Sequence, residues 1–294
     1  MIIFDGNQAA QAKEAQLKTR VAALREQNIH LKIAAILFTE DSGSVLYTRL
    51  KQEAAERVGM IYEVYTHSMA DDIAPVQAEI EALNQDPTVT GIIIQKPGKA
   101  RWLELAGAEK SNEDFQAWWT SLVSRLDEKK DVDGLHPATL AAVENNTWKQ
   151  EKKVLPATAK AVLEILRQSQ QLAPDRKVII LGKSDILGKP LFYEFKNQGF
   201  QVEMIGSKEL NQRIEQKKYL LDADIIVSAT GRQGLIIGDL VKNGVVVVDV
   251  GEPKPDVDFA TVAPKASFIT PVPGGVGPIT VISLLENCVE LIES

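Results

Sequence analysis

The sequence predicts a two-domain α/β protein in which mostly parallel sheets are covered by helices. In the first half, segments of helical periodicity alternate with short apolar runs, which is the pattern of parallel strands joined by helices. In the second half, apolar runs end at glycine or aspartate, as central strands of a parallel sheet do. A glycine-bearing turn at 182–188 separates one such run from a helix, so we expect the second domain to be doubly wound.

The first half alternates between the two periodicities. Leu17, Val21 and Leu24 recur at helical spacing, and Gly59 ends a second apolar stripe as a C-cap. The stretch 98–130 is rich in tryptophan and predicts helices whose packing the sequence does not reveal. The expected helices are 9–27, 44–58 and 73–83, and the expected strands are 31–38, 61–65 and 89–94.

A new domain begins near Leu155. We assign residues 1–145 to an N-terminal α/β substrate domain and 146–277 to the doubly wound domain. A C-terminal helix over 278–294 is expected to return to the first domain and complete it. The other expected helices are 157–168 and one from Pro190, and the expected strands are 178–181, 202–205, 225–228, 245–250 and 267–269.

The composition limits the function classes. The formal net charge is -7, from 33 basic and 40 acidic residues, which argues against a general nucleic-acid binder. The three histidines form no cluster with metal-ligand spacing, and the single cysteine, Cys288, suits a helix core, so we expect neither a metal site nor a disulfide. No apolar run is long enough to span a membrane and no secretory signal is evident, so we expect a cytoplasmic protein that does not contact membranes.

The turn from Gly182 to Gly188 stands where a Rossmann-type domain holds a dinucleotide pyrophosphate. Backbone N–H groups and a helix N-terminus can face the anion there, and glycine allows close approach. The pattern differs from G-x-G-x-x-G, and an ordinary strand-to-helix turn explains it equally well when taken alone. Two further strands run into Gly231 and Gly251, and three such strand ends together favour a ligand-binding edge.

The segment 271–278 is the most unusual in the chain. Three glycines and three prolines in eight residues define a rigid backbone path, and Pro278 suits the first position of the final helix. The N–H groups before that helix can meet a ligand carbonyl or phosphate. A purely structural hinge is the alternative, which we consider weaker.

Four polar residues of the first half are candidate catalytic or binding groups. Tyr47 and Lys51 are four apart, so they share a helix face beside the apolar stripe, where a partly desolvated lysine is a usable base. A solvated surface lysine is the simpler interpretation of this pair alone. Gln95 lies at the carboxyl end of a strand, and Asp133 lies in an acidic turn that needs no function to explain it.

Together these segments resemble the methylenetetrahydrofolate dehydrogenase/cyclohydrolase family, in the family's order and over nearly the whole chain. The segment 271–278, Pro-Val-Pro-Gly-Gly-Val-Gly-Pro, is close to diagnostic. The other matching segments are Tyr47-Thr-Arg-Leu-Lys51 with Gly59, Gly91-Ile-Ile-Ile-Gln95-Lys-Pro97, Lys130-Asp-Val-Asp-Gly134, Gly182-Lys-Ser184 with Gly188 and Pro190, and Asp249-Val-Gly251. The resemblance implies a homodimer that oxidises 5,10-methylenetetrahydrofolate to the methenyl form with NADP and hydrolyses that product to 10-formyltetrahydrofolate.

The resemblance also implies roles for the residues of the folate site. Lys51 becomes the acid/base for hydration, Gln95 hydrogen-bonds it, and Tyr47 lines the site and positions the folate ring. Asp133 accepts hydrogen bonds from the pterin. The implied backbone contacts to the substrate come from Pro271, Gly274 and Gly275.

For the cofactor, the resemblance implies NADP, with NAD as the possible substitute. Lys183 stands where the family has arginine and, with Ser207 and Lys208, is expected to bind a 2′-phosphate. The acidic residue that usually binds a free ribose is not evident there, and Glu209 is the nearest candidate for that role. The remaining implied contacts are Gly182, Ser184 and Gly188 to the phosphates, and Thr230 and Gly231 near the nicotinamide.

Two alternatives remain open on the sequence. One is another two-domain NAD(P)-dependent dehydrogenase, against which the Lys51 and Gln95 pairing and the 271–278 segment argue. The other is a non-catalytic nucleotide-binding relative, in which Trp118 and Trp119 form an interaction surface rather than core. The departures from the family pattern are Pro156-Ala-Thr-Ala, Lys96, Gly98, Lys183 and the longer stretch 98–130.

Overall fold

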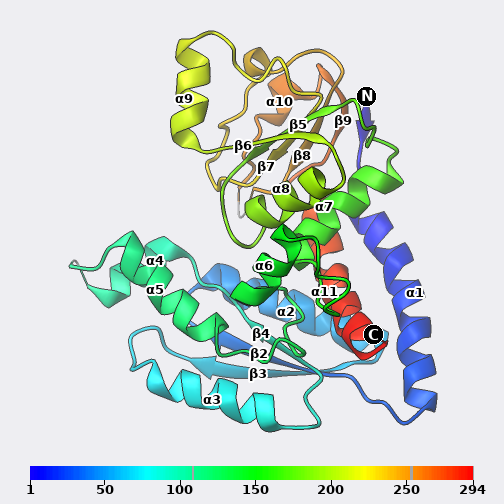
Figure 1. Cartoon of the computed structure of the whole chain (residues 1–294), viewed down its shortest axis with the longest axis vertical. Helices are drawn as coiled ribbons and strands as arrows, with labels where there is room; N and C mark the ends of the chain where they lie inside the picture. The colour runs from blue at the N-terminus through cyan, green and yellow to red at the C-terminus, as the bar shows by residue number, and fades with distance from the viewer. Residues whose placement is uncertain (108, 252–253, 294) are drawn as a thin grey trace. The chain divides into compact units, whose positions relative to one another are not determined.

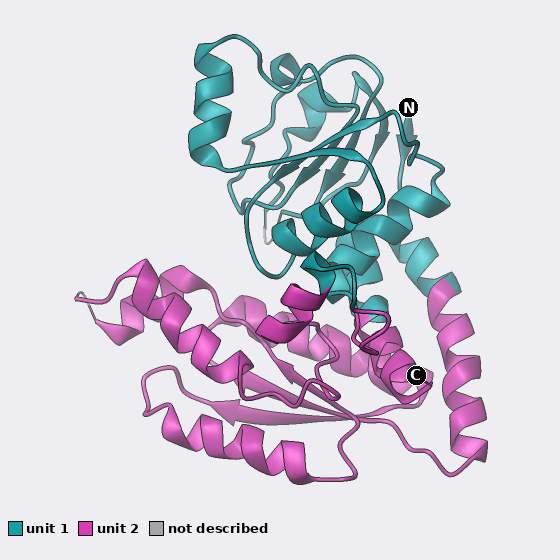
Figure 2. Cartoon of the chain, viewed as in Figure 1, with its two compact units in different colours: residues 1–12, 143–147, 155–283 teal, residues 13–142, 148–154, 284–294 magenta. Residues whose placement is uncertain are grey.

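The computed structural model describes residues 1–107, 109–251 and 254–293 and divides into two compact units (Figure 2). We call these the six-stranded unit and the three-stranded unit after their sheets. Two long helices, α1 (Gly6–Glu26) and α11 (Val276–Glu293), contribute residues to both units. The six-stranded unit comprises Met1–Ala12, Val143–Thr147 and Leu155–Ser283, and the three-stranded unit comprises Lys13–Ala142, Trp148–Val154 and Leu284–Ser294.

The three-stranded sheet is parallel, with β2 (Lys32–Phe38) between β3 (Ile61–His67) and β4 (Gly91–Ile94) (Figure 1). Helices α2 (Ser42–Val58) and α3 (Ala74–Gln85) lie on opposite sides of it. Successive strand residues point to opposite faces, so Ala34 and Ile36 pack in the cluster with α3 while their neighbours face the other way. The predicted C-cap of α2 is confirmed, since Gly59 has φ 89°, and at the other end the Asp41 side chain accepts from the backbone N of Ser44 as the N-cap.

The tryptophan-rich stretch folds into α4 (Lys99–Ala106) and α5 (Asn112–Val123), as the sequence predicts. The rings of Phe38, Trp102, Phe115 and Trp118 pack with neighbouring centroids between 5.1 and 5.9 Å apart. Trp119 is 3% exposed and belongs to the same core cluster. The rings therefore serve core packing rather than an interaction surface.

The six-stranded sheet is parallel throughout, in the order β1-β9-β8-β7-β5-β6 (Figure 1). Its apolar strands are buried on both faces, as expected for a parallel sheet covered by helices. The chain passes from β5 to β6 on one side and then to β7 on the other, so the strand order switches between β5 and β7. The strands are β1 (Ile2–Ile3), β5 (Lys177–Leu181), β6 (Gln201–Ile205), β7 (Ile225–Ser228), β8 (Val245–Asp249) and β9 (Ala266–Ile269), and the helices are α7 (Ala157–Gln168), α8 (Gly188–Asn197), α9 (Ser207–Glu215) and α10 (Phe259–Val262), with a 3-10 turn at Gly238–Leu240.

Several short elements escape the sequence analysis, and several ends differ. Strand β1 has two residues, and its pairing with β9 places residues 1–12 in the six-stranded unit. Helix α9 has nine residues, of which only Leu210 and Ile214 are apolar, and α6 (Pro137–Glu144) has eight residues, so both are too short for a clear periodic signal. The first helix begins at Gly6 rather than residue 9, α8 begins at Gly188 rather than Pro190, and α11 begins at Val276 rather than residue 278, which places Pro278 inside its first turn.

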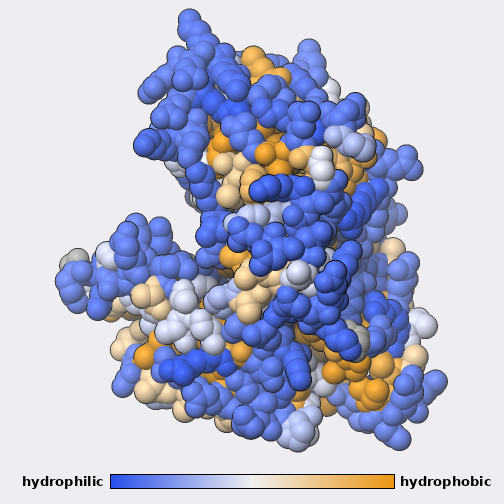
Figure 3. All heavy atoms as spheres, viewed as in Figure 1, coloured by the Kyte–Doolittle hydropathy of each residue, from blue (hydrophilic) through white to orange (hydrophobic). Residues whose placement is uncertain are grey.

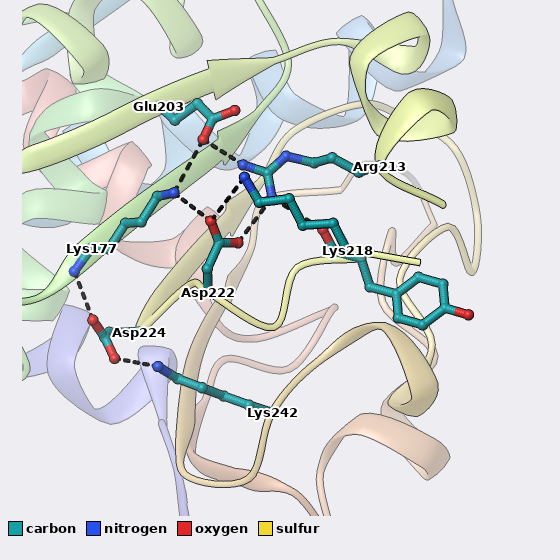
Figure 4. Close-up of polar contacts among 8 residues, drawn as sticks. Lys177, Glu203, Arg213, Lys218, Asp222, Asp224 and Lys242 are labelled. Carbon is teal, nitrogen blue, oxygen red and sulfur yellow. Dashed lines mark hydrogen bonds and ion pairs between the residues drawn. The ribbon is translucent and has the colours of Figure 1, made fainter. Parts of the chain in front are cut away.

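A network of charged side chains joins the elements of the six-stranded unit away from the carboxyl ends of its strands (Figure 4). Arg213 on α9 is 5% exposed and pairs with Glu203 on β6 and with Asp222, at 2.9 Å from the latter's Oδ1. Lys177 at the start of β5 pairs with the same two carboxylates. Burial alone would raise the pKa of Asp222, but the hydrogen bonds from Lys177 and Arg213 hold it below its usual value.

Hydrophilic residues cover most of the face seen in Figure 3. The exposed large apolar residues include Val45, Leu46 and Leu50 of α2 and Ile2 and Ile3 of β1. Across the described part of the chain, no helix combines the length and the apolar composition that a membrane span requires.

Candidate active site

Lys51 lies on the buried face of α2 and is 6% exposed. Its Nζ donates a hydrogen bond to Oε1 of Gln95 at 2.9 Å and lies 3.7 Å from Oδ2 of Asp133. The three residues come from one helix, one strand end and one turn of the three-stranded unit. An amine held by a neutral amide and a carboxylate, largely shielded from solvent, can exchange a proton with a bound reactant.

The loop that carries Gln95 is fastened to the start of α2. The backbone N of Gln95 donates to the carbonyl O of Ile36, which continues the pairing of β4 with β2. The Asp41 carboxylate accepts from the backbone N of Gly98 at 3.2 Å, and the Ser44 hydroxyl donates to the carbonyl O of Lys96 at 3.3 Å. The N-cap of α2 thus holds the loop after Gln95 against the start of the helix that carries Lys51.

The turn that carries Asp133 is fixed by the residues around it. Asp131 is 1% exposed and accepts hydrogen bonds from the backbone N of Leu135 and His136 and from the Thr139 hydroxyl. Burial raises the pKa of Asp131, although these hydrogen bonds oppose the rise. Lys130 donates to the carbonyl oxygens of residues 83, 84 and 86 at the end of α3, so it is a structural cap.

Two positions in the turn between β5 and α8 have room only for glycine. Gly182 has φ +117°, and a Cβ there would lie 2.5 Å from the carbonyl O of Ala229. A Cβ at Gly188 would lie 2.0 Å from the carbonyl O of Gly182. Ser184 receives hydrogen bonds on Oγ from the backbone N of Leu187 and Gly188. This close backbone packing at a helix N-terminus, beside the switch in strand order, fits a dinucleotide pyrophosphate.

The loop after β7 is held by a buried carboxylate that the sequence analysis missed. Asp256 is fully buried and accepts from the Ser228 hydroxyl at 2.8 Å and from the backbone N of Thr230 and Arg232. The Arg232 guanidinium then reaches the start of α9, after β6, where its Nη1 donates to the Ser207 hydroxyl at 3.1 Å. Thr230 and Gly231 lie in this loop, which the structure brings beside Ser207.

Lys183 and Glu209 form an ion pair near Ser207. Glu209 also accepts a hydrogen bond from the backbone N of Gly206, and the Lys183 contact and this backbone bond lower the pKa of Glu209 to about 2. Lys208 is exposed on the first turn of α9. Ser207 therefore has three cationic side chains in its vicinity, those of Lys183, Lys208 and Arg232. The carboxylate of Glu209 lies in the same region.

Asp249 ends β8 and is 2% exposed. Its carboxylate accepts from the backbone N of Gly251, Asp256 and Val257 at 2.8, 3.2 and 3.0 Å. Burial raises the pKa of Asp249 to about 6, against the effect of these hydrogen bonds. The expected strand end at Gly251 is therefore organised by an aspartate that fixes the following loop.

The loop 271–275 packs against the start of α1. The backbone N of Gly6 donates to the carbonyl O of Gly274 at 2.9 Å, and a Cβ at Gly6 would lie 1.9 Å from the carbonyl O of Gly275. Gly275 in turn approaches Pro271 so closely that a Cβ would lie 2.4 Å from the Pro271 carbonyl O. Because the backbone is packed this closely, few other backbone conformations are open to Pro271, Gly274 and Gly275.

The structure thus gathers the predicted residues into two groups. The three-stranded unit brings together Lys51, Gln95 and Asp133, with Tyr47 one turn before Lys51 on α2. The six-stranded unit brings the phosphate turn, the β7 loop and the start of α9 to one edge of its sheet. Arg232 is the residue that sequence reasoning missed there, because a lone arginine after a glycine carries no recognisable signal.

Comparison with known proteins identifies matching family models and similar chains. A family model for the tetrahydrofolate dehydrogenase/cyclohydrolase catalytic domain matches residues 4–133, and the model for the NAD(P)-binding domain of the same family matches residues 156–294. The bifunctional protein FolD of Lactobacillus acidophilus is 36% identical over 98% of this chain and 96% of its own length.

Solved structures agree with these matches. The bifunctional FolD methylenetetrahydrofolate dehydrogenase/cyclohydrolase of Campylobacter jejuni is 31% identical, with a TM-score of 0.86 over 100% of this chain and 99% of that one. The FolD dehydrogenase-cyclohydrolase of Trypanosoma brucei, complexed with NADP and an inhibitor, is 28% identical with a TM-score of 0.84, over 99% of this chain and 97% of that one. Matches of this extent across both units show that the chain belongs to the tetrahydrofolate dehydrogenase/cyclohydrolase family.

Proposed function

We propose that this protein oxidises 5,10-methylenetetrahydrofolate to 5,10-methenyltetrahydrofolate with NADP and then hydrolyses the product to 10-formyltetrahydrofolate. Family membership supports both activities. The observation that carries the hydrolytic step is the buried Lys51, whose Nζ lies within hydrogen-bond distance of Gln95 and 3.7 Å from Asp133.

Four side chains of the three-stranded unit have separate roles at the folate. Lys51 gives or takes the proton as water adds to the methenyl carbon, and Gln95 keeps the amine oriented through its carbonyl oxygen. Asp133 accepts hydrogen bonds from the pterin amino and ring N–H groups, and Tyr47 lines the site on the same helix face as Lys51. The backbone at Pro271, Gly274 and Gly275 supplies further substrate contacts.

The nicotinamide accepts the hydride when the dinucleotide is bound. Gly182, Ser184 and Gly188 fit the pyrophosphate, because the two glycines let the backbone pack closely in a turn that presents a helix N-terminus to an anion. Thr230 and Gly231 lie in the loop beside it and serve the nicotinamide half. The residues of the protein itself bind and orient the dinucleotide.

NADP is the cofactor that the charges around Ser207 favour. Lys183, Ser207 and Lys208 offer donors to a 2′-phosphate, and Arg232 adds a planar guanidinium that already contacts Ser207. Glu209 neutralises Lys183 in part, so the selectivity against NAD is expected to be moderate. The relative from Trypanosoma brucei was solved with NADP.

We further propose that the protein works as a cytoplasmic homodimer, which the family resemblance supports for the assembly. The single cysteine, buried and unable to form a disulfide within the chain, is compatible with a reducing compartment. Light scattering on the purified protein tests the assembly, and fractionation of the source cells tests the location.

The deciding experiment is an absorbance assay with methylenetetrahydrofolate and NADP, repeated with NAD. Cofactor reduction followed by loss of the methenyl absorbance is the expected result. A folded protein that reduces neither cofactor would contradict the dehydrogenase. Hydrolysis of added methenyltetrahydrofolate then separates a protein with cyclohydrolase activity alone from a non-catalytic relative.

A further inference from the structure

Two buried hydroxyls of the three-stranded unit have no hydrogen-bond partner among the described residues: Oγ1 of Thr48 and the OH of Tyr62. Thr48 is 3% exposed and Tyr62 is 7% exposed. A buried polar group without a partner is uncommon in a folded protein, since it loses its hydration without compensation. Such a group is therefore expected to bind a ligand or an ordered water.

One hydroxyl belongs to the helix that carries Lys51, and the other to the strand on which that helix packs. Thr48 lies three residues before Lys51 on the buried face of α2, and α2 packs on β3, which carries Tyr62. Tyr62 is paired in register with Ile33, whereas Tyr65 is paired with Ile36 and packs in the opposite core cluster with α3. The alternation of the strand therefore points Tyr62 to the face that α2 covers.

The Tyr62 phenol is also within electrostatic reach of Asp133. Burial raises the pKa of Tyr62, and the Asp133 carboxylate raises it further, so the phenol stays protonated and can donate. The same carboxylate lies 3.7 Å from Nζ of Lys51. A donor of this kind is suited to hold a carboxylate in place.

We infer that Tyr62 is a positioning residue of the folate site, whose hydroxyl holds the Asp133 carboxylate through one buried water that Oγ1 of Thr48 also binds. This inference rests on the proposed function, because it assigns Asp133 to the pterin. Two hydroxyls and a carboxylate give the water three polar partners, which is the number that buried waters typically have. Tyr62 touches no reacting atom and acts through Asp133.

The test compares Tyr62→Phe, Thr48→Val and the double variant with the wild type in the full-length protein. The measurements are KM and kcat for methylenetetrahydrofolate, the KM for NADP, direct binding of the folate, and the thermal midpoint. Tyr65→Phe is the matched control, because Tyr65 lies on the same strand but donates to Glu63 on the other side of the sheet.

We expect Tyr62→Phe to raise the folate KM and Kd roughly tenfold, because the water that holds the Asp133 carboxylate loses one hydrogen bond, with kcat and the NADP KM changed little. Its thermal midpoint should change little, because the phenol makes no direct hydrogen bond to the protein. Thr48→Val should have a smaller effect in the same direction. The double variant should be no worse than Tyr62→Phe by more than about twofold, since both hydroxyls bind one water.

An unchanged folate KM in Tyr62→Phe overturns the inference, and so does a parallel rise in the NADP KM with a fall in the thermal midpoint, which marks a packing role. Effects of the two single variants that multiply in the double variant overturn the shared water. A wild type that binds no folate contradicts the proposed function instead, so the two failures are distinguishable.

Discussion

The Nζ of Lys51 donates a hydrogen bond to Oε1 of Gln95 across 2.9 Å, although the two residues are 44 positions apart. The contact joins α2 to the end of β4, and the Asp41 and Ser44 side chains hold the same two segments together. The amide carbonyl accepts from the amine without adding a charge of its own.

This geometry makes Lys51 the residue on which hydrolysis depends. We expect Lys51→Ala to lower the rate of methenyltetrahydrofolate hydrolysis by at least about 100-fold, the range typical of a general acid or base. Gln95→Ala should lower it less, because the amine remains. Stopped-flow or steady-state absorbance of the methenyl group measures both, with Glu56→Ala, an exposed position of the same helix, as the control. Hydrolysis at the wild-type rate in Lys51→Ala would remove this residue from the mechanism.

Arg232 is expected to set the preference for NADP. Arg232→Ala should raise the KM for NADP roughly tenfold while changing the KM for NAD by less than about twofold, because a free ribose offers no phosphate to the guanidinium. The two cofactors measured on one variant control for damage to the loop. Equal losses with both cofactors would show that Arg232 acts on the loop and not on the 2′-phosphate.

A substitution of Glu209 should change the affinity for NADP in the opposite direction. Glu209→Gln frees Lys183 from its ion pair and should lower the KM for NADP several-fold. The KM for NAD should not fall with it. Fluorescence titration of the two dinucleotides without folate measures the corresponding change in Kd, and a weaker affinity for NADP would contradict the assignment of Lys183.

The charge network of Figure 4 is expected to stabilise the six-stranded unit through Arg213. Arg213→Ala removes the buried guanidinium from Glu203 and Asp222, which Lys177 still neutralises in part, and should lower the free energy of unfolding by about 2 kcal/mol. Lys218→Ala, in the same network but 50% exposed, should cost less than about 1 kcal/mol. Urea unfolding measures both, and equal effects would refute the role of burial.

Asp249 gives the stability a defined pH dependence. Its folded pKa of about 6 lies above the unfolded value near 3.8, so the folded state binds the proton more tightly. The contribution is therefore fully present below about pH 4 and is lost as the pH rises through 6. Thermal midpoints of the wild type relative to Asp249→Asn should fall over this window. A difference that stays flat between pH 4 and 7 would exclude the raised pKa.

The sequence by itself determined the elements and their order. The spacing of Leu17, Val21 and Leu24 predicted α1, and the apolar runs predicted the central strands of both sheets, because periodicity is a local property of the chain. It also pointed to the phosphate turn and to the C-cap of α2 at Gly59, where backbone geometry favours glycine. A short, mostly polar helix such as α9, with two apolar residues in nine, gave no clear signal.

The tertiary structure alone decided which distant side chains meet. Arg232 reaches Ser207 from 25 positions away, Asp256 clamps the loop after β7, and the Tyr62 phenol faces the helix that carries Lys51. Nothing in the neighbouring residues of Arg232 or Tyr62 distinguishes them from surface or core positions. The reason is physical: a contact between segments depends on strand order and register, which only the folded sheet fixes.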